Sequence, residues 1–346
     1  MAERPDLQTF ETSLGGRVYQ IPLEAFPGFW AFAYLVLFED YRVLVDAGSG
    51  YGNSNEHLEA GLREAGNRDC GQALNFADLT HILITHGHID HFGGLAYVRP
   101  RTQAQLGVHE LDRRNLTNYE ERRTVAARHL ARFLAEAGVS AERQDGLLAL
   151  YTFTKGLFHS VSVDITYGNS GMHLGPFEFL HVPGHSAGHV VIRFHDILFS
   201  GDHVLEGISP HQAPESLTLS TGLGHYLDSL DSLETWAGDI RLTLGGHRAP
   251  IGDLPARLEA IRAIHQDRLK QVLETLATPH TIAEISRRLF GEVHGYNVLL
   301  ALEEAGAHVE YLDQRGLLSI ENLEELEHHN GPVALRYRTI EAPEAK

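Results

Sequence analysis

Short runs of alternating hydrophobic and polar residues dominate the first third of the chain and return in its middle. Such alternation is typical of strands with one buried face. Between two of these runs, residues 55–65 have helical spacing and end at Gly66, where we predict the helix C-cap. Because strand and helix patterns follow one another, we predict a layered α/β domain. The predicted strands are 18–23, 32–38, 43–46, 80–85, 177–182, 190–194, 197–200 and 241–244.

Two other parts of the chain are helical in pattern. Residues 109–160 form an amphipathic insertion, which either packs on the core as a helix pair or walls an apolar substrate pocket. The last third predicts three helices and a short strand, the outline of a small winged-helix-like module, with Thr281 and Glu284 as a capping box. We therefore predict a catalytic domain at 1–252 and a C-terminal module at 253–346.

Composition narrows the class of protein. The 346 residues are 43% hydrophobic, enough for a buried core, and carry a formal net charge of −18. Such an acidic chain is poorly suited to DNA, and RNA is also disfavoured. With Cys70 as the single cysteine, no internal disulfide forms. The N-terminus has no signal-peptide pattern, and no apolar run approaches the roughly 20 residues that span a bilayer. We expect a cytoplasmic protein that binds no membrane.

One short motif predicts metal chemistry. His86, His88, Asp90 and His91 form an H-x-H-x-D-H run directly after a predicted strand. In an extended segment, residues two apart point to the same side, so His86 and His88 can share one metal. Asp90 and His91 follow at a turn and can face a second metal. Imidazole nitrogens with carboxylates suit zinc, iron or manganese. A metal-free surface cluster of histidines is the alternative.

Three distant residues support the metal interpretation. His185 lies in PGHSAGH, Asp202 in FSGDH and His247 in LTLGGH. Each follows a predicted strand and stands beside glycine, and in layered α/β folds sites form at such strand ends. The sequence therefore predicts that these three residues join the motif.

Together these residues resemble the metallo-β-lactamase-fold superfamily over about residues 15–250. The resemblance implies a four-layered αββα sandwich with two divalent metal ions, zinc being expected and iron or manganese the alternatives. Asp46, in LVDAG, matches the family's early aspartate, which orients a ligand loop. The resemblance implies that metal 1 binds His86, His88 and His185, that metal 2 binds Asp90, His91 and His247, and that Asp202 bridges both.

Asp202 also restricts the activity that the resemblance implies. True β-lactamases of the superfamily lack this aspartate, whereas glyoxalase II-like thioesterases, lactonases and RNases have it. We therefore expect a hydrolase that uses a metal-bridged hydroxide on an ester, thioester or lactone, with a small acyl substrate. Asp90 is the expected proton carrier. His225 and Tyr226 are candidates to donate to the substrate oxyanion, although packing of their helix explains them equally well.

Other functions stay open. Lactamase-β-like endoribonucleases pair a similar core with a winged-helix-like module, so a phosphodiesterase acting on single-stranded RNA is the main alternative. Against it, residues 278–330 hold ten acidic side chains but only three basic ones, Arg287, Arg288 and Arg315. The C-terminal module could instead bind a partner protein or form a homodimer.

Overall fold

The structure is a computed structural model that describes residues 4–168 and 172–340. The chain divides into two compact units. Unit 1 comprises Met1–Arg122, Leu157–Pro210 and Ser229–Leu258. Unit 2 comprises Arg123–Gly156, His211–Asp228 and Glu259–Lys346. Each unit is therefore built from three separate stretches of sequence.

Unit 1 contains two β-sheets. The seven-stranded sheet has the order β1-β2-β3-β4-β5-β6-β7, in which the last three pairs are parallel. The five-stranded sheet has the order β12-β11-β10-β9-β8. The strands of the first sheet are β1 (Gln8–Glu11), β2 (Arg17–Phe26), β3 (Phe29–Phe38), β4 (Tyr41–Val45), β5 (His81–Leu83), β6 (Gln105–His109) and β7 (Ile165–Tyr167). Those of the second are β8 (Met172–Leu174), β9 (Phe177–His181), β10 (Val190–Phe194), β11 (Ile197–Gly201) and β12 (Leu242–Gly245).

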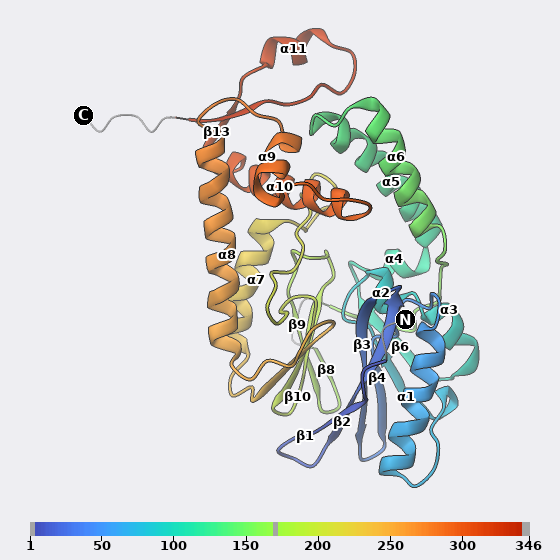
Figure 1. Ribbon diagram of the computed structural model, residues 1–346. Coiled ribbons are helices and arrows are strands. Elements are labelled where there is room, and N and C mark those ends of the chain that lie inside the picture. Colours follow the sequence, from blue (N-terminus) through green and yellow to red (C-terminus); the bar gives the residue numbers. More distant parts are fainter. Residues whose placement is uncertain (1–3, 169–171, 341–346) are drawn as a thin grey trace. The chain divides into compact units, whose positions relative to one another are not determined.

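Helices cover the outer faces of the two sheets in unit 1 (Figure 1). Leu58 and Leu62 of α1 belong to one buried cluster with residues of the first sheet. On the second sheet, the Arg193 guanidinium lies 5.0 Å from the ring of Trp236, the last residue of α7. The helices of this unit are α1 (Ser54–Asp69), α2 (Ile89–Phe92), α3 (Leu95–Val98), α4 (Arg113–Thr117) and the second half of α7 (Leu223–Trp236), with the 3-10 turns η1 (Phe76–Asp78) and η2 (Arg99–Arg101).

A separate apolar core fills the space between the two sheets. It includes Val36 and Val45 from the first sheet and Phe179 and Phe199 from the second, all buried. The rings of Tyr34 and Phe199 lie 5.2 Å apart across this core. Alternation along the strands puts these residues on the inner faces. The predicted αββα sandwich is therefore confirmed.

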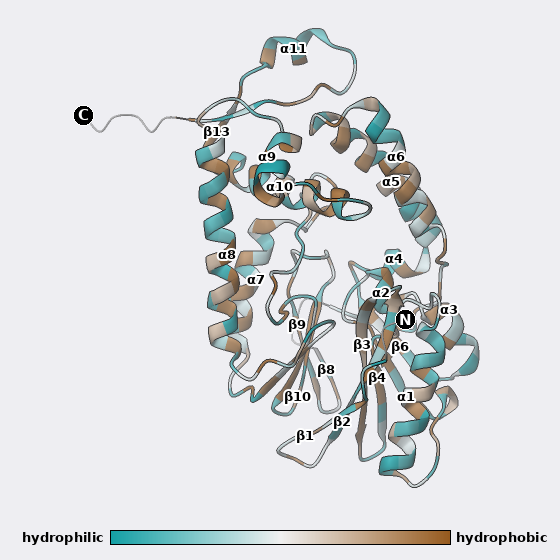
Figure 2. Cartoon of the chain, viewed as in Figure 1, coloured by the Kyte–Doolittle hydropathy of each residue, from teal (hydrophilic) through white to brown (hydrophobic). Residues whose placement is uncertain are grey.

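Unit 2 is mainly helical. Its core joins Leu130 and Phe133 of the insertion to Val272 and Leu299 of the C-terminal part. Figure 2 shows hydrophobic and hydrophilic residues alternating along α5, α6 and α8, as in amphipathic helices. The elements are α5 (Tyr119–Glu136), α6 (Ala141–Lys155), α8 (Leu254–Thr275), α9 (Ile282–Phe290), α10 (Asn297–Asp313) and α11 (Leu323–His328), with β13 (Leu318–Ile320) paired to β14 (Tyr337–Thr339).

This grouping differs from the division that the sequence suggested. Most of the insertion, predicted to belong to the catalytic domain, shares a core with the C-terminal helices instead. The domain boundary at residue 252 stays a prediction, as does the winged-helix likeness of the C-terminal module. The capping box is confirmed, because the Thr281 hydroxyl accepts from Glu284 N and the Glu284 carboxylate accepts from Thr281 N.

One predicted helix end is wrong. Helix α1 continues past Gly66 to Asp69, and Cys70 is its C-cap. Gly66 has a packing role: a Cβ at this position would lie 2.5 Å from Leu74 N. The glycine therefore lets the following loop pass close to the helix backbone.

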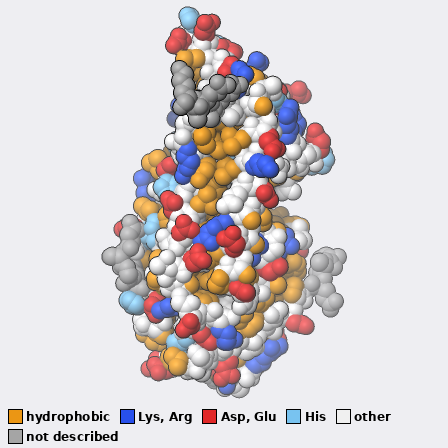
Figure 3. All heavy atoms as spheres, turned by 90° about the vertical axis from the view of Figure 1, so that its left-hand side faces the viewer, with side chains coloured by type: hydrophobic (Ala, Val, Ile, Leu, Met, Phe, Trp, Pro, Cys, Tyr) orange, Lys and Arg blue, Asp and Glu red, His pale blue; other side chains and the backbone are white. Residues whose placement is uncertain are grey.

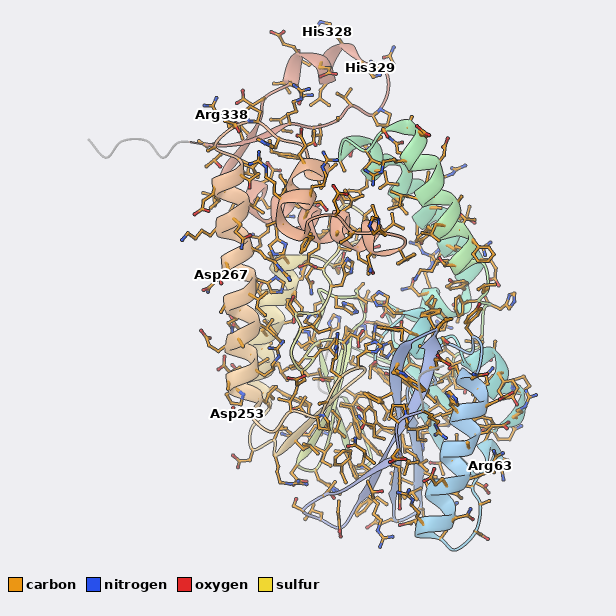
Figure 4. All side chains as sticks on the ribbon, in the orientation of Figure 1. Arg63, Asp253, Asp267, His328, His329 and Arg338 are labelled. Carbon is orange, nitrogen blue, oxygen red and sulfur yellow. The ribbon has the colours of Figure 1, made fainter. Side chains whose placement is uncertain are left out.

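The exterior carries charged side chains. Arg63 on α1 and Asp267 on α8 are exposed and point away from their own units (Figure 4). Within residues 4–168 and 172–340, every helix is too short or too polar to cross a membrane.

Candidate metal centre

Three histidines in unit 1 form the first of two neighbouring groups of ligand atoms. His86 and His88 follow β5, and His185 follows β9. One ring nitrogen from each lies within 4.8 Å of the others. His86 Nε2 and His88 Nδ1 are 3.1 Å apart. His86 and His185 are buried and His88 is half-buried, so this group, which we call the three-histidine group, has limited access to solvent.

The second group combines two carboxylates with two imidazoles: Asp90, His91, Asp202 and His247. His247 Nε2 lies 3.3 Å from Asp90 Oδ2, and His91 Nε2 lies 3.9 Å from the same oxygen. Each residue stands just beyond a strand or in the short helix α2. The structure thus brings together all seven residues that the sequence singled out as metal ligands.

Asp202 faces both groups. Its Oδ2 lies 3.7 Å from His185 Nε2 and 3.4 Å from His247 Nε2. Its Oδ1 lies 3.4 Å from His91 Nε2. The residue follows β11 at Gly201, whose positive φ of 50° turns the chain there. One carboxylate therefore reaches both groups of ligand atoms.

Asp46 orients part of this centre, as the family resemblance implied. It follows β4 in a left-handed conformation, with φ of 59°. Its Oδ1 accepts from Thr85 N and its Oδ2 from Thr85 Oγ1, both at 2.8 Å. His91 Nδ1 lies 2.8 Å from Asp46 Oδ2. Since the carboxylate can only accept, His91 carries its proton on Nδ1 and presents Nε2 to the centre.

Two further contacts orient this centre. His247 Nδ1 donates to the Trp30 carbonyl at 2.7 Å, which leaves Nε2 facing the carboxylates. His189 Nε2 accepts from Asp202 N at 3.0 Å, and its ring stacks on His86 at 4.6 Å. A backbone carbonyl carries no sequence signal, so only the fold could reveal the first contact. His189 stands four residues after His185, in the same PGHSAGH segment.

Charge is distributed unevenly over the centre. Burial disfavours a charged imidazole at His247, but Asp202 and Asp90 raise its pKa to about 10. Burial also disfavours an ionised Asp202, yet His247 and His91 keep the pKa of that carboxyl well below its usual range. Burial and the neighbouring His91 lower the pKa of His86 far below its usual value. The carboxylates therefore attract positive charge, while the imidazole of His86 stays neutral.

These residues fit a bound divalent cation. His91 Nε2 and Asp202 Oδ1 are buried, and neither has a hydrogen-bond partner among the described residues. Neutral imidazoles and carboxylates are the donors that zinc, iron and manganese accept. A cation would satisfy both atoms and would replace the protons that the two carboxylates attract.

The two other predicted catalytic residues lie in unit 2. The Tyr226 side chain is fully buried, and its ring lies 5.5 Å from that of His265. His225 Nε2 lies 3.2 Å from Glu215 Oε1, and His225 lines a surface pocket of about 180 Å³ with Tyr311 and Arg315. Their roles as oxyanion donors stay predictions.

Unit 2 also contains a third group of ligand-type residues, His265, Glu304 and His308. His265 Nδ1 and His308 Nε2 are 3.2 Å apart, and His308 Nδ1 donates to the Glu304 carbonyl at 2.7 Å. The Glu304 carboxylate accepts from Arg268 at 2.8 Å and from Gln212 N at 2.7 Å. Because Arg268 already pairs with the Glu304 carboxylate and brings positive charge to the group, we interpret it as a buried polar network rather than a cation site.

The fold and the centre agree with the family comparison. The metallo-beta-lactamase superfamily matches residues 31–273, and the chain belongs to this family. The family and the two ligand groups together point to a metal-dependent hydrolase. A metallo-beta-lactamase family protein from Thermus thermophilus is 26% identical, with a TM-score of 0.74 covering 93% of this chain and 98% of that one. A beta-lactamase domain protein from Burkholderia ambifaria shares the fold, with 24% identity and a TM-score of 0.72 over 96% and 94%.

Curated relatives are more distant. Lactamase-like protein nscB from Neosartorya fischeri is 24% identical over 281 residues, covering 75% of this chain and 66% of that protein. The probable metallo-hydrolase YqgX from Bacillus subtilis is 25% identical over 180 residues, covering 51% and 66%. The chain thus matches just under two thirds of the length of each relative.

Proposed function

We propose that the protein is a hydrolase that holds two divalent metal ions, zinc by preference, and cleaves an ester, a thioester or a lactone. The position of the Asp202 carboxylate carries this proposal, because it lies 3.7 Å from His185 Nε2 and 3.4 Å from His247 Nε2. A carboxylate that faces two ligand groups suits a pair of metals better than a single one. Metal 1 would bind the three-histidine group, and metal 2 would bind Asp90, His91 and His247, with Asp202 shared.

Bound metals supply a water of lowered pKa and a Lewis acid for the substrate oxygen. The chain's own residues then handle protons and orientation. Burial disfavours an ionised Asp90, but His91 and His247 hold the pKa of its carboxyl well below the usual range. Asp90 is therefore ionised at neutral pH, and we assign to it the proton that passes from the attacking water to the leaving group. Asp46 and the Trp30 carbonyl keep His91 and His247 in place.

Aromatic side chains beside the centre support an apolar acyl substrate. The Phe29 ring lies 4.7 Å from the His247 ring and is 45% exposed. Phe26 lies 6.4 Å from Phe29 and 6.1 Å from Tyr51, centroid to centroid. These residues come from the β2–β3 hairpin and the loop after β4. Exposed aromatic surface next to reactive groups is typical of a binding wall for an apolar substrate.

A phosphodiesterase acting on RNA is the alternative, and charge disfavours it. Affinity for nucleic acid depends on basic side chains that contact phosphates. The stretch 278–330 has ten acidic and three basic residues. On the face displayed in Figure 3, acidic and basic side chains are interspersed rather than gathered into a basic patch.

A substrate screen tests the proposal. Purified protein loaded with Zn²⁺, Mn²⁺ or Fe²⁺ is assayed on acyl-thioesters, lactones, p-nitrophenyl esters, bis-p-nitrophenyl phosphate and single-stranded RNA. We expect up to two metals per chain by elemental analysis, and hydrolysis in the ester, thioester or lactone arms. Protein that binds no metal and cleaves none of these compounds would disprove the proposal, and cleavage of RNA alone would favour the alternative.

The variant His88→Ala tests the three-histidine group directly. Removing one of three imidazoles should weaken metal 1 and lower kcat/KM by about 10³-fold or more, the scale of losing a central catalytic element. His88 is half-buried, so the variant should keep the wild-type circular dichroism spectrum. His328→Ala, at the exposed end of α11, is the control and should keep full activity. Unchanged activity in His88→Ala would exclude His88 from the site.

A further inference from the structure

Asp112 is a fully buried carboxylate in unit 1 that no motif in the sequence explains. It stands three residues after β6, at the N-cap position of α4. An aspartate at that position usually accepts a hydrogen bond from its own helix. Here the side chain makes no such cap bond. The local role of an N-cap therefore does not account for the buried carboxylate.

The carboxylate reaches two other loops instead. Gly87 N donates to Asp112 Oδ2 at 2.7 Å, and Ser186 Oγ donates to the same oxygen at 2.9 Å. Gly188 N donates to Oδ1 at 3.1 Å. Gly87 lies between His86 and His88, and Ser186 follows His185 directly. A single side chain thus joins the two loops that supply the three-histidine group.

The glycines show that this contact is tight. A Cβ at Gly188 would lie 2.7 Å from Asp112 Cγ, and one at Gly87 would lie 3.1 Å from it. Both loops approach the carboxylate with bare backbone, which larger residues would prevent. Gly87, Gly188 and Asp112, which are far apart in the sequence, therefore pack closely against one another.

We propose that Asp112 is a positioning residue that fixes the spacing of His86, His88 and His185 and so sets the affinity of the three-histidine group for its metal. This inference rests on the proposed metal-dependent function. Side chains that orient metal ligands typically change affinity 10- to 100-fold when they are replaced. Asp112 orients the metal ligands through the backbone of both ligand loops, whereas Asp46 contacts the His91 ring itself.

Asp112→Asn is the sharpest substitution because it keeps size and shape. Oδ1 accepts from Gly188 N and from Asn115 Nδ2 at 3.2 Å, while Oδ2 accepts from Gly87 N and Ser186 Oγ. An amide must place its NH₂ group at one of these two positions. In either orientation it faces a backbone N–H donor, so at least one of the backbone hydrogen bonds that tie the two loops to residue 112 is lost.

The test measures Zn²⁺ affinity by competition with a chromophoric chelator, together with the visible spectrum of Co²⁺-loaded protein. We expect Asp112→Asn to weaken one Zn²⁺ site about 10- to 100-fold and to alter the Co²⁺ bands. The control Asn115→Ala removes only the local donor and should stay within about threefold of wild type. Ser186→Ala, which deletes one of the inter-loop bonds, should give an intermediate loss; it also serves as the deciding variant if Asp112→Asn does not fold.

The outcomes separate this inference from the proposed function. If wild type binds Zn²⁺ and both Asp112→Asn and Ser186→Ala bind it equally well, the positioning role is wrong. An equal loss in Asn115→Ala would also overturn it, because a general loosening of the loop would then explain the effect. If the variants lose affinity as expected but wild type hydrolyses no substrate in the screen, the proposed function fails and the positioning role stands. A wild type that binds no metal would overturn both.

Discussion

At the scale of single residues, two buried aspartates support the two ligand groups by different routes. Asp46 bonds to Thr85 and contacts one ligand ring directly, that of His91, so its strongest influence falls on the group that holds His91 and His247. Asp112 bonds to the loops around the three histidines. We therefore expect a change at Asp46 to affect mainly metal 2 and a change at Asp112 to affect mainly metal 1.

Asp46→Asn tests this separation. Asparagine tolerates the left-handed backbone at position 46, so the fold should persist. Its amide has one acceptor oxygen, which cannot serve both Thr85 N and His91 Nδ1, and we expect affinity for one metal to fall about 10- to 100-fold. A Zn²⁺ titration in the presence of a chelator should show loss of one binding step in Asp46→Asn and of the other in Asp112→Asn. Loss of the same step in both variants would contradict the assignment.

Sequence alone predicted all seven ligand candidates, because histidine and aspartate after strand ends form a pattern that spacing reveals. It missed Asp112 although Asp112 also follows a strand. The strand β6 (QLGVH) was not predicted, since Gly107 interrupts a run of only five residues. The bonds from Asp112 reach Gly87, Ser186 and Gly188, so they depend on tertiary contacts that no local pattern encodes.

At the scale of elements, most predicted strands lie within a few residues of the observed ones, and Glu39 and Asp40 form the turn between β3 and β4. Long alternating runs define their own register, because one face must be buried. The short strands β1, β6, β7 and β8 gave no such signal. Gly66 misled the prediction of a helix end because a glycine selected for close packing looks the same in sequence as a C-cap.

The β2–β3 hairpin tip is the element that we expect to contact substrate. Phe29→Ala should raise KM for a long-chain acyl ester by about 30-fold, since burying a phenyl ring is worth about 2 kcal/mol. The value of kcat and the kinetics on an acetyl ester should change little. Steady-state kinetics on both esters checks this.

Phe153→Ala is the matched comparison for that experiment. Phe153 is 70% exposed on α6, in the helical segment that the sequence suggested as a pocket wall. We expect its KM to stay near that of wild type. A rise in KM for Phe153→Ala without one for Phe29→Ala would assign acyl binding to the helical segment instead.

At the scale of the whole molecule, the helical insertion has a structural task that sequence could not reveal. Its apolar residues Leu130, Phe133, Leu134 and Leu147 are buried with α8, α9 and α10 residues in one core. Amphipathic spacing shows that a helix has a buried face but does not identify the surface that covers it. The same spacing is therefore compatible with a pocket wall and with a second core.

The core of unit 2 contains titratable groups whose protonation is linked to folding. Burial, and after it the positive charge of a protonated His308, lowers the pKa of His265 to about 2. Burial lowers the pKa of His308 to about 4. Burial raises the pKa of Glu304 to about 7, although Arg268 opposes the shift. Below pH 6.5 an unfolded histidine binds a proton that the folded one does not, so these two histidines make the folded protein less stable as pH falls. Between pH 7 and 4.5 Glu304 binds a proton in the folded protein but not in the unfolded chain, so it makes the folded protein more stable as pH falls.

Comparison of His265→Gln with wild type isolates one of these contributions. The variant loses the hydrogen bond to His308 and should be less stable than wild type at pH 7. At pH 5 the folded wild type still refuses the proton, which costs about 2 kcal/mol relative to pH 7 for a histidine of ordinary unfolded pKa. The gap in free energy of unfolding between variant and wild type should therefore narrow by about that amount on going from pH 7 to pH 5. Urea unfolding of metal-free protein at both pH values measures it, with His328→Gln as the exposed control; a gap that stays constant would show that His265 is charged in the folded protein.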